Sequence, residues 1–432
     1  MQTLLLVAGR SRRFWPLAEK SLVPLTGKTL LAHQLEHLKA GGCTDVVLVC
    51  GKHNKKEVKR LFPEHRIIEQ QDLEKGMQGA LLSALPKIKG PVMVVGGNDV
   101  IEPGAYRALL KAASRKGVDG ALLAQKVKRY FPGGYLSVKR GKITNIVEKP
   151  GEGNEPSKLV NIVAHVHQNP SALLKLLKEV GNENDDGYER ALAVLFREKN
   201  YVAVPYEGTW QAVKYPWHLL SLLPAFLEEI GKPHISRKAS VHPTAVVEGR
   251  VIIEDDVRLL PHAAVIGPCY IGRGSIIGNG ALVRGSSIGE RCVVGFGTEV
   301  KGSVLMDDVW THMTYIGDSV IGSNVSFGGG CMTGNFRLDE GEISSQVGHD
   351  SIATGLTKFG AIIGPHCRLG IQVGTNPGIK IGSGSFVAGG THLKEDIPEK
   401  SFVSMKDGKL FVRENRIDVA LPEQRKKYVP KK

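Results

Sequence analysis

The sequence has few aromatic residues and lacks any long apolar run. Phe, Trp and Tyr make up 6% of its 432 residues. A membrane-spanning helix needs about 20 consecutive apolar residues, and no stretch of this chain approaches that length. The apolar residues 4–8 near the start are too few for the core of a secretory signal. We therefore expect a cytoplasmic protein with no membrane partner.

Cysteine is also sparse. The six cysteines form no CxxC pair and are too few for a disulfide scaffold, which argues against a small secreted fold. Their number and spacing instead indicate buried or free thiols in a reducing compartment.

Positive charge is in excess. The net charge of +14 suits either a nucleic-acid binder or a binder of phosphorylated small molecules. No nucleic-acid-binding motif is present, and the basic residues are scattered except in the tail from Arg425 to Lys432. We therefore favour phosphorylated small molecules and expect no nucleic-acid partner.

The strongest pattern in the chain is an aliphatic residue at every sixth position. Helices repeat every 3.6 residues and strands every 2, so neither produces this period. A parallel β-helix does, because each short strand places one aliphatic side chain in a narrow core while small residues turn the corner. After Val283 the period shortens by one residue and then resumes. The members are Val241, Val247, Ile253, Leu259, Val265, Ile271, Ile277 and Val283, followed by Ile288, Val294 and Val300.

The first half of the chain alternates strands with short helices. This alternation predicts a mostly parallel sheet covered by helices on both faces. Ligands of such sheets bind beyond the carboxyl ends of the strands, where the loop from Gly9 to Arg13 and the residue Asp99 are expected. The predicted strands are 2–8, 45–50, 66–69 and 91–95, and the predicted helices are 30–39, 55–61 and 80–85.

The loop after the first strand and Asp99 suggest phosphate chemistry. Glycine lets backbone N–H groups approach phosphate oxygens, and arginine offsets their charge. Arginine-rich loops are also common as simple solvated surface. Asp99 suits a Mg²⁺ ligand between phosphates, and it equally suits the cap of a turn.

Taken together, these segments resemble the signature of sugar-1-phosphate nucleotidylyltransferases. The similarity rests on AGRSRR at 8–13, Lys20 and VPLTGK at 23–28, and it extends over nearly all of residues 1–220. It implies a Rossmann-like α/β domain that uses Mg²⁺. The resemblance assigns Gly9, Arg13 and Lys20 to phosphates, Gln71 and Gly76 to the base, Gly134, Glu148 and Asn161 to the sugar, and Asp99 to the metal.

Several residues depart from that signature. Ser11 stands in place of its second glycine, Arg12 in place of threonine, and Met77 in place of another threonine. Related proteins with a W-x-D motif use its aspartate as a second metal ligand, and this chain has Ala212 there.

A second group of polar residues follows the shortened repeat. Acetyl transfer to an amine needs a base, for which histidine is suited, and cations that hold a phosphate. A histidine in a β-helix is alternatively a core or stacking residue. The residues are Arg284, Lys301, His312, Tyr315 and Asn335.

This second group resembles the acetyltransferase half of bifunctional glucosamine-1-phosphate acetyltransferases / N-acetylglucosamine-1-phosphate uridylyltransferases, above all the archaeal type. The similarity implies a left-handed β-helix that forms a homotrimer with acetyl-CoA as co-substrate. It makes His312 the base, gives the phosphate to Arg284 and Lys301, completes the pocket with Tyr315 and Asn335, and places Lys358 and Ala361 at acetyl-CoA.

Three functions remain open at this level. The first is acetyl transfer to glucosamine-1-phosphate combined with transfer of a nucleotide from UTP to the product. The second keeps only the acetyltransferase, and the third is a non-catalytic sensing or assembly subunit. A zinc site is a further alternative, although the histidines lack the spacing of known zinc β-helices. The expected domains are 1–217, a linker helix at 218–234, the β-helix at 235–403 and a basic arm at 404–432.

Overall fold

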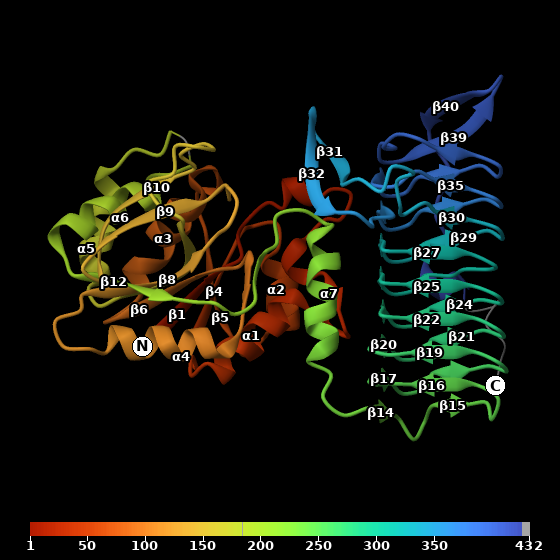
Figure 1. Cartoon of the computed structure of the whole chain (residues 1–432), viewed down its shortest axis with the longest axis horizontal. Coiled ribbons are helices and arrows are strands. Elements are labelled where there is room, and N and C mark those ends of the chain that lie inside the picture. The colour runs from red at the N-terminus through yellow and green to blue at the C-terminus, as the bar shows by residue number, and fades with distance from the viewer. Residues whose placement is uncertain (184, 426–432) are drawn as a thin grey trace. The chain divides into compact units, whose positions relative to one another are not determined.

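The computed structural model describes residues 1–183 and 185–425, which form two compact units (Figure 1). The first, here called the α/β unit, comprises Met1–Arg10 and Leu31–Val213. The second, the β-helix unit, comprises Ser11–Leu30 and the chain from Lys214 onward. The segment Ser11–Leu30 therefore belongs to the β-helix unit although it lies near the start of the sequence.

The α/β unit is built on a nine-stranded sheet of order β5-β4-β1-β6-β11-β8-β12-β10-β9. β1 runs parallel to β4 and β6, while β11 runs antiparallel to β6. The strands are β1 (Gln2–Leu6), β4 (Val46–Cys50), β5 (Arg66–Glu69), β6 (Val92–Gly96), β8 (Gly120–Lys126), β9 (Gly134–Lys139), β10 (Lys142–Glu148), β11 (Leu159–His167) and β12 (Tyr201–Pro205). A separate pair is formed by β7 (Asp99–Ile101) and β13 (Trp210–Ala212).

Helices cover this sheet, as the alternation of strands and helices predicted. β4 and β6 are buried along their whole length, which explains why both sequences are continuous aliphatic runs. The helix predicted at 80–85 begins earlier, at Gly76. The helices are α1 (Leu30–Ala40), α2 (Lys55–Leu61), α3 (Gly76–Ala84), α4 (Pro103–Ala113), α5 (Pro170–Glu179) and α6 (Gly187–Glu198).

The β-helix unit is the left-handed parallel β-helix that the repeat predicted, with three sheets forming a prism (Figure 1). Along the coils each strand pairs in parallel with the strand of the next coil, whereas the last pair, β39 (Ser401–Lys406) with β40 (Lys409–Glu414), is antiparallel. The first sheet contains β14 (His234–Ile235), β17 (Val251–Ile253), β20 (Cys269–Ile271), β23 (Ser287–Ile288), β26 (Val304–Leu305), β28 (Val320–Ile321), β33 (Ala361–Ile363) and β36 (Ile379–Ile381).

The second and third sheets complete the prism. The second contains β15 (Ser240–Val241), β18 (Arg258–Leu259), β21 (Ile276–Ile277) and β24 (Val293–Val294), and bridges through Trp310 lead to β29 (Ser326–Phe327), β34 (Arg368–Leu369), β37 (Phe386–Val387), β39 (Ser401–Lys406) and β40 (Lys409–Glu414). The third contains β16 (Val246–Glu248), β19 (Ala264–Ile266), β22 (Leu282–Arg284), β25 (Glu299–Lys301), β27 (Tyr315–Gly317), β30 (Met332–Thr333), β35 (Gly374–Thr375) and β38 (His392–Leu393).

The aliphatic residues of the repeat form the core of the prism. Ile253, Ile271 and Val283 are fully buried, whereas Val241 in the first coil is 39% exposed because no coil covers it. The shortened period after Val283 is also confirmed, since Ile271 pairs with Ile288 and the stack continues without a break.

The β-helix unit also contains two short helices and two hairpins outside the coils. The helix α7 (His218–Glu228) precedes the first coil, and Trp217 beside it packs on Phe359 with ring centroids 6.1 Å apart. An antiparallel hairpin of β31 (Ile343–Val347) and β32 (Asp350–Leu356) interrupts the repeat. The hairpin β2 (Pro24–Leu25) and β3 (Lys28–Thr29) and the short α8 (Pro422–Arg425) complete the unit. Most of the basic tail, residues 426–432, lies outside the described residues.

Candidate functional site

The outer face of the third sheet carries three of the five residues predicted for acetyl transfer, and Asn335, two residues after β30, contacts one of them. In β22, β25 and β27 the central residues point into the core, so their neighbours point outward. Arg284 pairs with Lys301 on the next coil, and Glu299 pairs with Tyr315. The fold thus stacks the two predicted cations on successive coils at one edge of the sheet.

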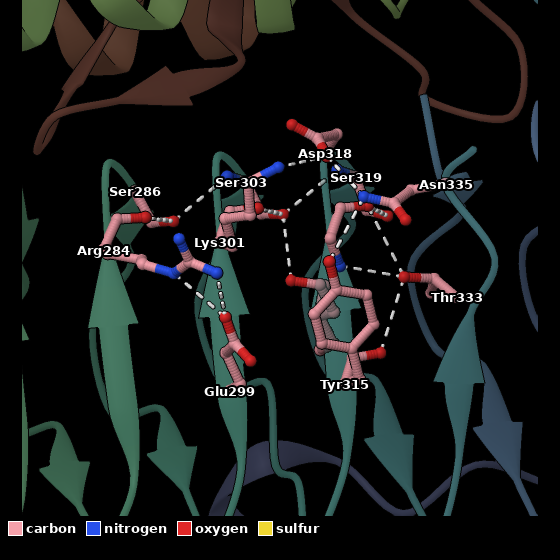
Figure 2. Close-up of polar contacts among 12 residues, drawn as sticks. Arg284, Ser286, Glu299, Lys301, Ser303, Tyr315, Asp318, Ser319, Thr333 and Asn335 are labelled. Atoms are coloured by element: carbon pink, nitrogen blue, oxygen red, sulfur yellow. Dashed lines mark hydrogen bonds and ion pairs between the residues drawn. The ribbon is translucent and has the colours of Figure 1, made fainter. Parts of the chain in front are cut away.

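Each cation is held by a carboxylate to which the sequence analysis gave no role (Figure 2). Arg284 donates to Glu299 Oε1 from Nε at 2.9 Å and from Nη2 at 2.5 Å. Lys301 Nζ lies 3.1 Å from Asp318 Oδ2. Glu299 lies two residues before Lys301 in β25, so both side chains point outward from the same strand. This spacing was the signal in the sequence that could have predicted Glu299 as a partner of the cations.

Asp318 joins the cations to the predicted sugar pocket. Asn335 Nδ2 donates to Asp318 Oδ2 at 2.5 Å and to the Tyr315 hydroxyl at 3.2 Å. The Asp318 carboxylate therefore links Lys301 to Asn335, and the Asn335 amide continues the link to Tyr315, as Figure 2 shows. The arrangement fixes three side chains that the resemblance assigns to the substrate.

A ladder of buried serines holds the strands that carry these residues. Ser303 N–H donates to Ser286 Oγ at 3.1 Å, and Ser319 N–H donates to Ser303 Oγ at 3.0 Å. Each hydroxyl also donates to the carbonyl two residues before it, including those of Arg284 and Lys301 at 2.8 Å (Figure 2). All three serines are fully buried, so the ladder fixes the backbone behind both cations.

His312 lies at a different corner of the prism from the cations. It is exposed and sits between the Trp310 bridge of the second sheet and β27 of the third. Its ring faces Gly329, where an added Cβ would lie 3.6 Å from His312 Cδ2. Within one copy of the chain the structure shows no contact between His312 and Arg284 or Lys301 among the described residues.

The two residues predicted at acetyl-CoA differ in exposure. Lys358 is exposed and forms a backbone bridge with Phe336. Ala361 is fully buried in the core of the prism, and its N–H donates to Ser319 Oγ at 3.0 Å. Only Lys358 thus presents a side chain to solvent.

The three residues predicted to bind the sugar meet in the α/β unit. Gly134 pairs directly with Glu148 across β9 and β10. Val160 pairs with Tyr135 across β11 and β9, which brings the adjacent Asn161 to the same region. Burial, with the neighbouring charge of Glu148 as a second cause, raises the pKa of Glu189 on α6 to about 8. The sequence analysis did not identify Glu189.

The loop predicted to bind the base is closed by Gln70. Its Nε2 donates to Asp72 O at 2.7 Å and to Gly76 O at 2.9 Å. Gly76 has φ +47° at the start of α3, a conformation that favours glycine. Gln71 is exposed, and its backbone N–H donates to Ser83 Oγ. Gly9 is exposed in the loop after β1.

Asp99 is buried and already hydrogen-bonded. The Trp210 indole Nε1 donates to Asp99 Oδ1 at 2.7 Å, and Ala212 pairs opposite Asp99 across β13 and β7. No cluster of three or more metal-binding side chains exists among residues 1–183 and 185–425, whether around Asp99 or around the histidines considered for zinc. Within the paired positions of β7 and β13, Asp99 is the one carboxylate, and a bound Mg²⁺ would take other ligands from phosphates and water.

Arg13 and Lys20 lie in the segment Ser11–Leu30 of the β-helix unit. The Arg13 guanidinium lies 5.9 Å from the ring centroid of Tyr215, and Arg13 lines a cavity of about 570 Å³ together with Trp15 and Lys380. Lys20 begins a 3-10 turn, and its N–H donates to Ser11 Oγ at 3.3 Å.

This segment is fastened to the prism at three places. Thr26 N–H donates to Ser287 Oγ at 2.9 Å, and Ser383 Oγ donates to Pro16 O at 3.1 Å. The ammonium of Lys380 lies 5.6 Å from the Trp15 ring centroid and 2.8 Å from Asp396 Oδ2.

Comparison with known proteins agrees with this division of the chain. The nucleotidyl transferase family model matches residues 2–215, and the bacterial transferase hexapeptide model of six repeats matches residues 250–285. The bifunctional protein GlmU of Methanococcus maripaludis strain S2 / LL is 30% identical over 94% of this chain and 98% of its own length. This chain belongs to the bifunctional GlmU family.

Other members of the GlmU family match over similar lengths. The bifunctional protein GlmU of Methanococcus vannielii is 28% identical over 96% of this chain and 100% of its own. A bifunctional sugar-1-phosphate nucleotidylyltransferase/acetyltransferase of Sulfurisphaera tokodaii is 29% identical over 92% of this chain and 98% of its own. As a GlmU-family protein, the chain is a transferase with a nucleotidyltransferase part and a hexapeptide acyltransferase part. Among its described residues, no helix is long and apolar enough to cross a membrane.

Proposed function

We propose that the β-helix unit transfers an acetyl group from acetyl-CoA to the amine of glucosamine-1-phosphate. The observation that carries this proposal is the stacking of Arg284 and Lys301 beside Tyr315 and Asn335 on one sheet face. Arg284 offers a planar fork and Lys301 a point charge, a combination suited to a phosphate. Tyr315 and Asn335 offer hydrogen bonds to the sugar ring.

His312 serves as the base of this reaction. As the amine attacks the thioester carbon, the new C–N bond forms, the C–S bond breaks, and the amine loses a proton to the imidazole. His312 lies in the turn before β27, and Lys301 pairs with Gly317 at the far end of that strand, so the base and the cations flank one short strand. In the proposal, the hexosamine phosphate lies between the His312 base and the two cations.

A homotrimer completes this site in the proposal. Three apolar side chains lie exposed on the corner that carries His312, namely Phe296 at 56%, Met313 at 53% and Ile371 at 63%. Successive backbone hydrogen bonds stack them along this corner, with Met313 N–H donating to Phe296 O at 2.9 Å. Exposed apolar patches of this kind mark interfaces between proteins. Packing of a second copy here would place its residues, including Lys358, near acetyl-CoA.

The α/β unit joins the acetylated product to the nucleotide of UTP in the same proposal. A phosphate oxygen of N-acetylglucosamine-1-phosphate attacks the α-phosphorus of UTP, and pyrophosphate leaves as the new P–O bond forms. Gly134, Glu148 and Asn161 bind the sugar. The Gly76 loop with Gln71 binds the base, and Gly9 binds a phosphate. Arg13 and Lys20, in the segment Ser11–Leu30, are the cations proposed to neutralise phosphate charge. Mg²⁺ held at Asp99 would offset the charge of the leaving pyrophosphate.

Two assays test the proposal. Purified chain with glucosamine-1-phosphate and acetyl-CoA should release free thiol, and His312→Ala should lower that rate about 100- to 10,000-fold. Pyrophosphate release from UTP and N-acetylglucosamine-1-phosphate with Mg²⁺ tests the second reaction. A folded wild-type chain that releases no thiol would overturn the acetyltransferase assignment.

A second candidate retains only the acetyltransferase activity. The observation that favours it is Ala212 opposite Asp99, since this pair leaves a single carboxylate for the metal. A chain that releases thiol but no pyrophosphate would support this candidate. A folded chain active in neither assay would instead fit a sensing or assembly subunit. Both enzyme candidates act on soluble small molecules, and we place the protein in the cytoplasm with no nucleic-acid partner.

A further inference from the structure

Behind the predicted sugar site lies a continuous chain of buried hydrogen bonds. His165 connects Asn161 Oδ1, 2.6 Å from its Nε2, with the Tyr188 hydroxyl, 2.7 Å from its Nδ1. His167 continues the chain, with Nε2 3.0 Å from the Tyr188 hydroxyl and Nδ1 2.8 Å from the Tyr201 hydroxyl. All five side chains are buried, and both imidazoles are fully so.

Burial keeps these groups in their neutral forms. It is the main cause that lowers the pKa of His165 well below its ordinary value and lowers that of His167 to about 3. It also raises the pKa of Tyr188. Each of the four contacts therefore contains one proton, and neutral imidazole donates from one nitrogen while it accepts at the other.

These conditions leave two directions for the chain. In the first, Tyr201 donates to His167 Nδ1, His167 Nε2–H donates to Tyr188, Tyr188 donates to His165 Nδ1, and His165 Nε2–H donates to Asn161 Oδ1. In the second, the Asn161 amide is turned over, and every donor and acceptor is exchanged. The direction thus decides which end of the Asn161 amide faces away from His165.

Tyr201 decides between the two directions. In the second, its O–H points away from His167, and no other acceptor for it exists among the described residues. A buried donor without an acceptor disfavours a state by roughly 5- to 150-fold. In the first direction every donor of the chain is satisfied, so Asn161 directs its Nδ2 amide away from His165.

The free end of Asn161 faces the predicted sugar residues. Asn161 follows Val160, which pairs with Tyr135, and the neighbouring Gly134 pairs with Glu148. No hydrogen bond within residues 1–183 and 185–425 uses Asn161 Nδ2. The amide is therefore available to a ligand at this point of the unit.

We propose that His165 and Tyr188 are positioning residues that hold Asn161 as a hydrogen-bond donor toward the sugar. The ligand group at Asn161 is then an acceptor, such as a ring hydroxyl oxygen or the carbonyl of an acetamido group. This inference rests on the proposed nucleotidylyl function of the α/β unit. It assigns a specificity role to two residues that do not touch the substrate.

The direction of the hydrogen-bond chain is tested without an activity assay. Neutron diffraction from deuterated crystals of the full chain should show deuterium on Nε2 of both His165 and His167 and none on Nδ1. Deuterium on Nδ1 of either imidazole would overturn the proposed orientation of Asn161.

The role in sugar binding is tested by two matched variants. His165→Leu removes the group that directs Asn161, and we expect the KM for N-acetylglucosamine-1-phosphate to rise about fivefold or more, with the KM for UTP within about twofold of wild type. His167→Leu removes an equally buried imidazole, but Tyr188 can still donate to His165. Both KM values should then stay within about twofold of wild type. Melting temperatures show that both variants are folded.

The outcomes separate the positioning role from a structural role and from the proposed function. Equal increases of the sugar KM in both variants, or no increase in His165→Leu, would overturn the positioning role. If the wild type releases no pyrophosphate, the nucleotidylyl function fails and the sugar role fails with it. The deuterium positions then still establish or refute the direction of the chain.

Discussion

Ala212 lies directly opposite Asp99 in the antiparallel pair of β13 and β7. Side chains opposite each other in such a pair point to the same face, with Cβ atoms about 4.5–5.5 Å apart. A carboxylate at position 212 would therefore stand beside that of Asp99, within reach of a single Mg²⁺. Trp210, whose indole donates to Asp99 Oδ1, lies two residues before Ala212 in β13.

Ala212→Asp should strengthen Mg²⁺ binding. We expect the concentration of Mg²⁺ required for half-maximal pyrophosphate release to fall about tenfold, because hard divalent cations prefer sites with more carboxylate oxygens. Ala212→Asn, which adds bulk without charge, is the control. Equal Mg²⁺ requirements in the two variants would show that position 212 does not reach the metal.

Lys301→Met should weaken binding of the sugar phosphate. Removal of a charge-assisted hydrogen bond costs about 1.5–3 kcal/mol, so the KM for glucosamine-1-phosphate should rise about 10- to 100-fold while that for acetyl-CoA changes little. Arg273→Met changes an exposed arginine elsewhere on the prism and should leave both KM values unchanged. A larger change in the KM for acetyl-CoA would reassign Lys301 to the co-substrate.

Ser303→Ala should destabilise the β-helix unit. The Ser303 hydroxyl accepts from Ser319 N–H and donates to Lys301 O, and its loss leaves a buried N–H without its partner. The free energy of unfolding should fall by about 1–3 kcal/mol, measured by denaturant titration. Ser351→Ala, on an exposed position of β32, serves as the control. A value within error of wild type would mean that the ladder adds no stability.

Glu189 should make the stability of the α/β unit depend on pH. Burial raises the pKa of Glu189 from its ordinary value of 4.5 to about 8, so between these values the folded state holds a proton that the unfolded state has lost. Stability then decreases as pH rises through this window, by at most about 1.4 kcal/mol per pH unit. Glu189→Gln should remove this decrease and be the more stable protein at pH 8. A wild-type curve that rises from pH 5 to 8 would contradict the raised pKa.

The sequence predicted the prism well because its rule is local. Each aliphatic residue of the repeat, such as Ile277 or Val294, is recognised by its spacing of six from the next one, and both of these lie in the core. The turns at the corners also depend only on residues close in sequence. The cations Arg284 and Lys301 were predicted from the shift in the repeat and from the resemblance, and the structure places them at equivalent positions of successive coils.

The hydrogen-bond partners of these residues could not be predicted from the sequence, because they come from distant segments. Asp318 joins Lys301 and Asn335 only after the chain has turned through further coils. The network behind Asn161 draws Tyr188 from α6 and Tyr201 from β12, which no spacing rule connects to β11. The hairpin of β31 and β32 interrupts the period and left no periodic signal of its own.

The attachment of Ser11–Leu30 to the prism affects what can be learned from an isolated N-terminal fragment. A fragment that stops at residue 217 keeps Arg13 and Lys20 but loses Ser287, Ser383 and Lys380, which fasten that segment in the whole chain. The two cations proposed to bind phosphate would then lie on a stretch of polypeptide without these anchors. Nucleotidylyl transfer measured on such a fragment would report the loss of an anchor rather than the intrinsic capacity of the α/β unit.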